Sequence, residues 1–178
     1  MATPSHFFAL LALTFFSLAL AIGNNPLQDF CVADPNMLVN GFACKDPKLV
    51  DANDFFFSGL HLAGNTSNTV GSIITPVTVT ELPGLNALGI CLGRIDFAPK
   101  GIQPPHTPSC HRNQGFVHYQ RNGGYGSAAA IAALPSQNPG INFLPNTIFG
   151  AVPEISSDVL AKAFQLDKKV VMDLQKKF

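Results

Sequence analysis

The chain has 178 residues, of which 11 are basic and 11 are acidic, so its formal net charge at neutral pH is zero. Without a basic excess, nothing in the sequence attracts nucleic acid, and a binding partner of that class is excluded. The length is near that of one domain, and a hydrophobic content of 47% supplies enough apolar material for one core.

The N-terminus is typical of a secretory signal peptide. An unbroken apolar run covers residues 6–23, and small residues end it at Ala19, Ala21 and Gly23. A membrane anchor is the alternative, because the run has about the length that spans a bilayer. Polar residues follow at once, however, without a basic stop-transfer flank. We therefore expect residues 1–23 to be removed and the mature chain to be secreted, with no membrane segment.

Four cysteines follow the signal peptide, and cysteines pair in an oxidising compartment. Four cysteines allow three pairings. We favour Cys31–Cys44, because it closes a short loop bounded by turn-forming residues, and we expect it to add about 3 kcal/mol of stability. Cys91 lies in an apolar run and is predicted to be a buried thiol, whereas Cys110 has no evident partner.

A glycosylation sequon, Asn65-Thr66-Ser67, lies in a stretch rich in Gly, Asn, Ser and Thr. Such composition predicts a surface loop, where the transferase reaches its acceptor. Asn65 is therefore a predicted N-glycosylation site.

The middle of the chain is typical of an all-β domain, in which short strands alternate with Gly- and Pro-rich turns. The first strand contains Pro76, which predicts an edge position. The apolar run at 127–134 is compatible with a helix, but Gly and Pro bracket it tightly, so a buried strand is favoured. The predicted strands cover residues 73–80, 88–97, 127–134, 141–144 and 147–149.

Alternation gives the clearest strand, residues 88–97, two different faces. Cys91 and Phe97 share the apolar face, and Arg94 and Asp96 lie on the other. A catalytic pair is one interpretation of these two charges. We favour the simpler one, that they form the outward face of the strand.

Near the C-terminus the apolar residues recur at the spacing of an α-helix. Ser156 or Ser157 can cap a first amphipathic helix, and Asp167 can cap a second. Two such short helices have little core of their own, so we expect them to pack on the β-domain or on a neighbouring subunit. Membrane association is disfavoured, because the polar face of the second helix is not strongly basic.

Several long strings in this chain resemble the germin-like proteins of the cupin superfamily. They include PLQDFCVAD, NGFACKDP, NDFFFSGL, RIDFAPKGIQPPHT and VLAKAFQLDKKVV. The resemblance covers nearly the whole mature chain except residues 108–114. It implies a mainly β fold, a cupin jelly-roll barrel with short C-terminal α-helices. The implied parts are a signal peptide (1–23), an N-terminal arm with the disulfide (24–60), a truncated barrel (61–152) and the C-terminal helices (153–178).

The resemblance also implies a cellular location, an oligomeric state and a cofactor. Germin-like proteins are plant extracellular-matrix glycoproteins, typically hexamers, that bind manganese inside the barrel through three His and one Glu. Some oxidise oxalate, some dismutate superoxide, and many have no assigned activity. For this chain the resemblance therefore implies the apoplast or cell wall, self-association into a homo-oligomer through the C-terminal helices, and manganese as the cofactor.

The metal-binding boxes of the family are incomplete here. His106, in the string PPHT, matches the first ligand, and His118, in GFVHYQ, matches the His of the second box. Pro108 stands where the second His belongs, and residues 97–153 contain no Asp or Glu. We predict a partial manganese site of His106 and His118, no catalytic residue, and an incomplete barrel, because the family places several strands in the missing interval.

The same region contains a second possible metal-binding site. His106, Cys110, His111 and His118 contain ligand types that Zn²⁺ uses. Their spacing fits no standard structural zinc pattern, so chance clustering is the favoured interpretation.

Three hypotheses follow for function. The first is a secreted germin-like glycoprotein of the cell wall with a degraded manganese site, a structural, storage or defence-associated role and no turnover of its own. The second is a manganese-dependent oxalate oxidase or superoxide dismutase. The third is a non-functional product of a truncated gene or transcript.

Overall fold

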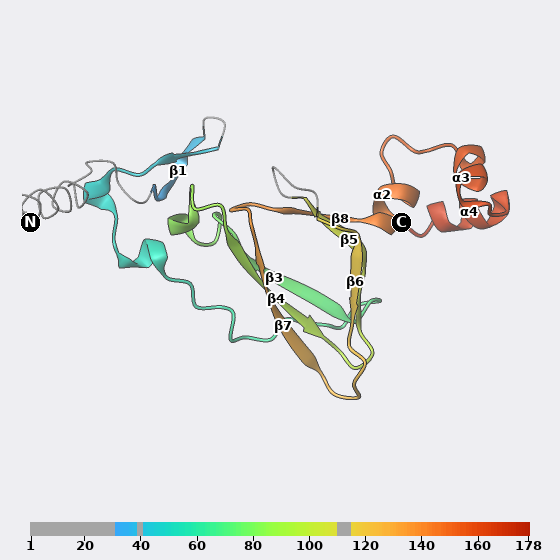
Figure 1. The fold of residues 1–178 in the computed structure, drawn as a ribbon, viewed down its shortest axis with the longest axis horizontal. Helices are drawn as coiled ribbons and strands as arrows, with labels where there is room; N and C mark the ends of the chain where they lie inside the picture. Colours follow the sequence, from blue (N-terminus) through green and yellow to red (C-terminus); the bar gives the residue numbers. More distant parts are fainter. Residues whose placement is uncertain (1–30, 39–40, 110–114) are drawn as a thin grey trace, which may run out of the picture.

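The structure, a computed structural model, describes residues 31–38, 41–109 and 115–178. The predictions for the signal peptide and for Cys110 and His111 therefore lie outside the described residues. Along the chain, Figure 1 shows a hairpin arm, a pair of β-sheets and a group of C-terminal helices.

The arm is a two-stranded hairpin. Strand β1 (Ala33–Leu38) pairs antiparallel with β2 (Phe42–Cys44). The predicted disulfide between Cys31 and Cys44 is present and joins two residues that are 13 positions apart. The short 3-10 helices of the described chain are η1 (Pro47–Leu49), η2 (Ala52–Phe55) and η3 (Pro83–Leu85).

A buried amide, Asn86, connects the arm to the β-domain. Its Nδ2 donates to Sγ of Cys31 and to the carbonyl of Phe42, each at 3.2 Å. Its Oδ1 accepts from Nε2 of Gln137 at 2.9 Å, and Oε1 of Gln137 accepts from the N–H of Ala87. Because Asn86 is 4% exposed, the network must satisfy its polar atoms internally.

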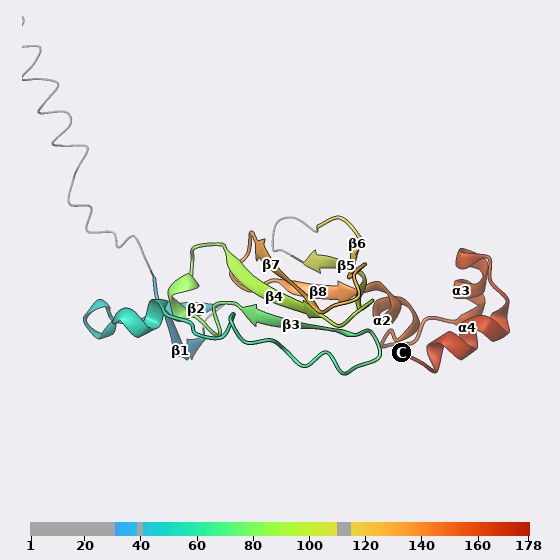
Figure 2. The same ribbon diagram turned by 90° about the horizontal axis from the view of Figure 1, so that it is seen from below.

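Two three-stranded antiparallel sheets form the β-domain and face each other across a cavity (Figures 1 and 2). Their strands are β3 (Ser72–Val77), β4 (Cys91–Phe97), β5 (Ile102–Ser109), β6 (His118–Arg121), β7 (Ala128–Leu134) and β8 (Gly140–Phe143). One sheet has the order β3-β4-β7 and the other the order β6-β5-β8. The pairing of β4 with β7 and of β5 with β8 brings distant segments of the chain together.

The two sheets do not close into a barrel within the described part of the chain. Strands β3 and β7 are the outer strands of one sheet, and β6 and β8 are those of the other. This open arrangement agrees with the incomplete barrel that the sequence predicts. Pro76 lies in β3, an outer strand, as expected for a residue that has no backbone N–H to donate to a sheet.

Strand β7 corrects the expectation of a buried strand at 127–134. The strand is present, but its first four residues are exposed, including Ile131 at 61%. It pairs on one side with β4, and only its later residues, Ala132 and Leu134, line the cavity. The other half of β7 thus has no second layer over it among the described residues, although its sequence is apolar.

A second correction concerns residues 147–149, which the sequence predicts to be a strand. They end the helix α2 (Leu144–Phe149). Pro145 lies in the first turn of this helix, where its fixed φ and missing N–H are tolerated. Oγ1 of Thr147 donates to the carbonyl of Phe143 at 2.9 Å, one helical turn earlier.

Helices α3 (Ser157–Phe164) and α4 (Lys168–Gln175) lie beyond α2 at the end of the molecule remote from the arm (Figures 1 and 2). Ser156 is the N-cap residue of α3, and the Asp167 carboxylate caps α4 by accepting from the N–H of Lys169 at 2.7 Å. Both N-cap positions agree with the sequence, but only Asp167 forms a side-chain capping bond; Ser156 forms none. None of the helices in the described ranges is long and apolar enough to cross a membrane.

Candidate functional site

Neighbouring strands bring His106 and His118 together. They face each other directly in the register of β5 and β6, and their ring centroids are 4.3 Å apart. His106 is 5% exposed, whereas His118 is exposed. On the other side of β5, Phe143 of β8 faces His106 with its ring centroid at 5.7 Å. The two imidazoles predicted from the sequence therefore form one local group.

A backbone carbonyl two residues earlier orients each imidazole. Nδ1 of His106 lies 2.8 Å from the carbonyl of Pro104, and Nδ1 of His118 lies 2.9 Å from that of Phe116. Because a carbonyl oxygen only accepts, the proton must be on Nδ1 in both rings. A neutral ring then has its lone pair on Nε2, which is the atom available to a metal ion or a hydrogen-bond donor.

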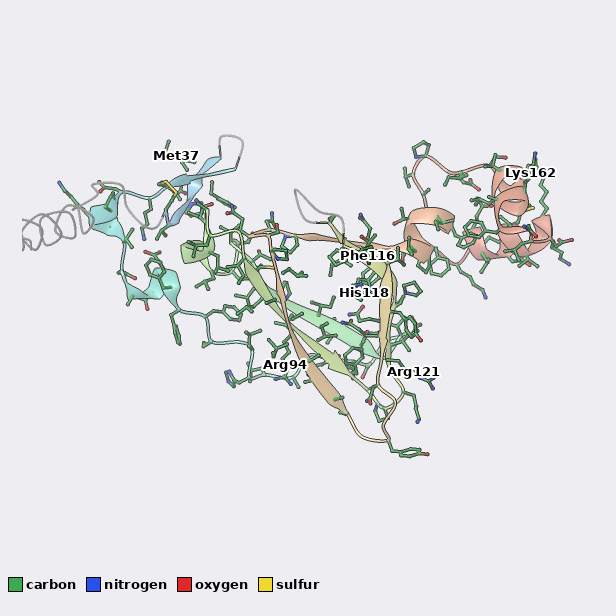
Figure 3. The ribbon with its side chains drawn as sticks, viewed as in Figure 1. Met37, Arg94, Phe116, His118, Arg121 and Lys162 are labelled. Atoms are coloured by element: carbon green, nitrogen blue, oxygen red, sulfur yellow. A yellow bond between two sulfur atoms is a disulfide. The ribbon has the colours of Figure 1, made fainter. Side chains whose placement is uncertain are left out.

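The two histidines line a cavity of about 120 Å³ between the sheets. Figure 3 shows His118 on β6, on the side toward the β3-β4-β7 sheet. The polar residues of the lining are His106, His118, Gln120 and Thr78. Most of the wall is apolar and includes Ile74, Cys91, Ile95, Leu134 and Ile141. The cavity thus combines an apolar wall with a small polar group on β5 and β6.

Gln120 is the site residue that the sequence analysis missed. It lies two positions after His118 on β6, and hence on the same face of the strand. Its Oε1 atom is buried and has no hydrogen-bond partner in the described chain. The period of two along the string HYQ is the signal that identifies it.

Pro108 also lines the cavity. It follows His106 by two positions on β5 and is buried. The resemblance places an imidazole here, but the pyrrolidine ring has no atom that can bind a metal or accept a proton.

No carboxylate of the described residues lines the cavity. Glu81 is hydrogen-bonded to a lining residue, because its Oε2 accepts from the N–H and the hydroxyl of Thr78 at 2.8 and 2.7 Å. Partial desolvation acts to raise the pKa of Glu81, but the hydrogen bonds from Thr78 outweigh it and hold the pKa below its usual value. The described residues contain no group of three His, Cys, Asp or Glu that could hold a metal ion.

Arg94, labelled in Figure 3, has a structural role on β4, where it pairs with Asp96 of the same strand. The guanidinium contacts the carboxylate at 2.7 Å and donates to the carbonyl of Leu60, while Oδ2 of Asp96 accepts from the N–H of Gly64. The hydrogen bond from Arg94 is the main cause that lowers the pKa of Asp96. The expected outward face is therefore covered at this point, since Asp96 is 5% exposed and the pair holds the segment 60–64 to the sheet.

Asn65 lies in a loop, and its side chain is exposed. Its Oδ1 accepts from the N–H of Ser67 at 2.9 Å. The sequon therefore occupies an accessible turn, as its composition indicates. The alternative zinc grouping cannot be assembled from described residues, because two of its members, Cys110 and His111, lie outside them.

Comparison with known proteins decides the family. The family model described as Cupin matches residues 58–111 and 113–172. The chain belongs to the cupin family. Within it, this cupin is 44% identical to "Putative germin-like protein 2-1" of Oryza sativa subsp. japonica, over 98% of this chain and 99% of the relative. It is also 44% identical to "Germin-like protein subfamily 1 member 20" of Arabidopsis thaliana, over 96% and 95% of the two chains.

A solved structure of oxalate oxidase in complex with the substrate analogue glycolate has the same fold. The TM-score is 0.76 at 36% identity, and the match covers 86% of this chain and 96% of the other. The predicted germin-like identity and cupin fold are thus confirmed.

The alignment with the first rice relative has 214 positions, more than the 178 residues of this cupin. The relative therefore has residues with no counterpart here. The family match is interrupted at residue 112, inside the interval where the resemblance in the sequence also fails.

The donor set that the described residues bring to the cavity does not fit manganese. Mn²⁺ is served best by carboxylate, carbonyl and water oxygens. The cavity offers two imidazoles and one amide oxygen, with Pro108 in the place of a further ligand. No reaction step is therefore assigned to a manganese ion in this chain.

Proposed function

We propose that this germin-like cupin is a secreted cell-wall glycoprotein with a structural, storage or defence-associated role and no turnover of its own. The observation that supports this role is the makeup of the cavity. His106 and His118 face each other, but no carboxylate among the described residues joins them. Carboxylate oxygen is among the ligands that suit Mn²⁺, so a cavity without one gives little support to a manganese oxidase or dismutase.

Three features support the extracellular setting. The N-terminal sequence is typical of a cleaved signal peptide. The Cys31–Cys44 disulfide requires an oxidising compartment to form and persist. The exposed Asn65 loop suits a glycan acceptor. Expression in plant cells tests the setting: the protein should be recovered from the apoplastic fluid, and its mass should fall after enzymatic deglycosylation.

Self-association through the C-terminal helices is part of the proposal. Leu160 and Val171 are buried, yet much apolar surface of this region remains uncovered in the single chain. The exposed apolar side chains are Val159, Phe164, Leu166, Val170, Met172 and Phe178. Extensive exposed apolar surface is typical of association sites. Light scattering on the secreted protein should give a mass above that of one chain.

The experiment for the role itself combines metal analysis and turnover on the secreted protein. We expect substoichiometric manganese and no oxalate- or superoxide-dependent turnover. Stoichiometric manganese together with either activity would overturn the proposal in favour of the enzymatic hypothesis.

A further inference from the structure

The cavity places three electron-pair donors on adjacent strands. His106 of β5 faces His118 of β6, and Gln120 follows on the same face of β6. The carbonyls of Pro104 and Phe116 fix both ring protons on Nδ1, so that each Nε2 keeps its lone pair. None of the three atoms has a hydrogen-bond partner in the described chain. All three atoms can therefore offer a lone pair to an occupant of the cavity.

Such a group favours an occupant with positive charge or with protons to donate. A buried acceptor that stays unpaired is unfavourable, and Oε1 of Gln120 is such an atom. Water can satisfy one or two acceptors, but a divalent cation can accept lone pairs from all three. Imidazoles oriented through Nδ1 by a backbone carbonyl are the usual form of metal-binding histidine.

The chemistry of the donors determines which cation fits. Imidazole nitrogen suits Zn²⁺, Cu²⁺ and Ni²⁺, whereas Mn²⁺ is weakest in the order of divalent affinities and prefers carboxylate. We infer that His106, His118 and Gln120 form a three-donor site for a borderline divalent cation of the Zn²⁺ class and that this site discriminates against Mn²⁺.

This inference rests on the proposed loss of the manganese site and assigns the remaining residues a different metal. Three protein ligands with a fourth position left to solvent are an ordinary arrangement for zinc. The open side of the β-domain suits this arrangement, because His118 is exposed while His106 is buried.

Titration of the folded, secreted protein with Zn²⁺ and Mn²⁺ by calorimetry tests the site, and Co²⁺ serves as the spectroscopic probe. We expect one Zn²⁺ per chain, bound at least about tenfold more tightly than Mn²⁺. Co²⁺ should give the visible absorption of a low-coordinate site without a thiolate band.

Three variants identify the donors. His118→Ala and Gln120→Leu should each weaken Zn²⁺ binding by about tenfold or more, while His61→Ala, a change at an exposed loop histidine, is the matched control. Gln120→Glu supplies the missing carboxylate and should raise Mn²⁺ affinity by about tenfold. Circular dichroism and thermal unfolding establish that each variant is folded.

Several outcomes would overturn the inference. They are equal affinity for Zn²⁺ and Mn²⁺, Zn²⁺ binding that survives both His118→Ala and Gln120→Leu, and a Co²⁺–thiolate band in the near ultraviolet, which would require a cysteine ligand. Absence of binding by either ion would also contradict it while leaving the proposed function intact. Manganese-dependent turnover would contradict the proposed function itself.

Discussion

Asp96 shows how a single buried carboxylate holds a length of chain in place. Arg94 binds it from two positions along β4, and the N–H of Gly64 binds it from the connecting segment. Each of these hydrogen bonds is stronger to the ionised form, so the pKa of Asp96 lies below its usual value, chiefly because of Arg94. The residue therefore links protonation to the docking of residues 60–64.

Stability should fall in acid for this reason. A carboxyl group with a lowered pKa in the folded state contributes stability that is full above its unfolded pKa and is lost as the pH drops through the folded value. Denaturant unfolding measured from about pH 5 down to pH 2 should show this loss. In Asp96→Asn the free energy of unfolding should be about 1–3 kcal/mol lower at neutral pH and should depend less on pH. A variant with an unchanged pH profile would contradict this role.

The Cys31–Cys44 disulfide closes a short loop at the start of the described chain. Cross-linking limits the unfolded ensemble, so Cys31→Ser should lower the free energy of unfolding by about 3 kcal/mol. Thermal unfolding under non-reducing conditions measures the change. The wild type with reductant is the matched comparison and should lose about the same stability. No change in melting temperature would argue against the stabilising role.

At the scale of elements, the arm depends on the polar network of Asn86. Its side chain bonds both the hairpin and Gln137. Asn86→Ala removes these bonds and leaves partly buried polar partners unpaired, which should cost about 1–3 kcal/mol. Proteolysis should then release the arm before the β-domain unfolds. Equal protease resistance of the variant and the wild type would show that the arm is held by other contacts.

Strands and caps with a local cause could be predicted from the sequence. The alternation of apolar and polar residues predicts β4, and Asp167, as a capping residue, predicts where α4 begins. The burial of β7 could not be predicted, because it depends on whether another strand covers it. Likewise His106 and His118 can be recognised individually, but that they face each other depends on the β5–β6 register, which sets residues of two strands side by side. Residues 147–149 are predicted to be a strand, but they belong to α2, which begins directly after β8.

The whole molecule consists of two open sheets with a helical end beside them. Whether these parts unfold together in one cooperative transition can be measured. Six strands pair in two sheets, and a connected polar network ties the arm to them. We expect calorimetry of the secreted protein to give a single cooperative transition. A broad, non-cooperative melt would instead favour the hypothesis of a non-functional product.

The interruption of the family match at residue 112 also has a genetic test. The genomic sequence between the codons for Thr107 and Gly115 should join the two flanks directly if the shortened chain is the natural product. An in-frame segment that encodes the missing box would identify the chain as a splicing or gene-model product.

We propose that this germin-like cupin has kept two histidines of a manganese site without the carboxylate that makes the site fit manganese. Electron paramagnetic resonance measures this directly, because free aqueous Mn²⁺ gives a six-line signal that weakens when the ion is bound. With one equivalent of folded protein, we expect the six-line signal to persist at nearly its full amplitude. Stoichiometric loss of the signal would contradict it.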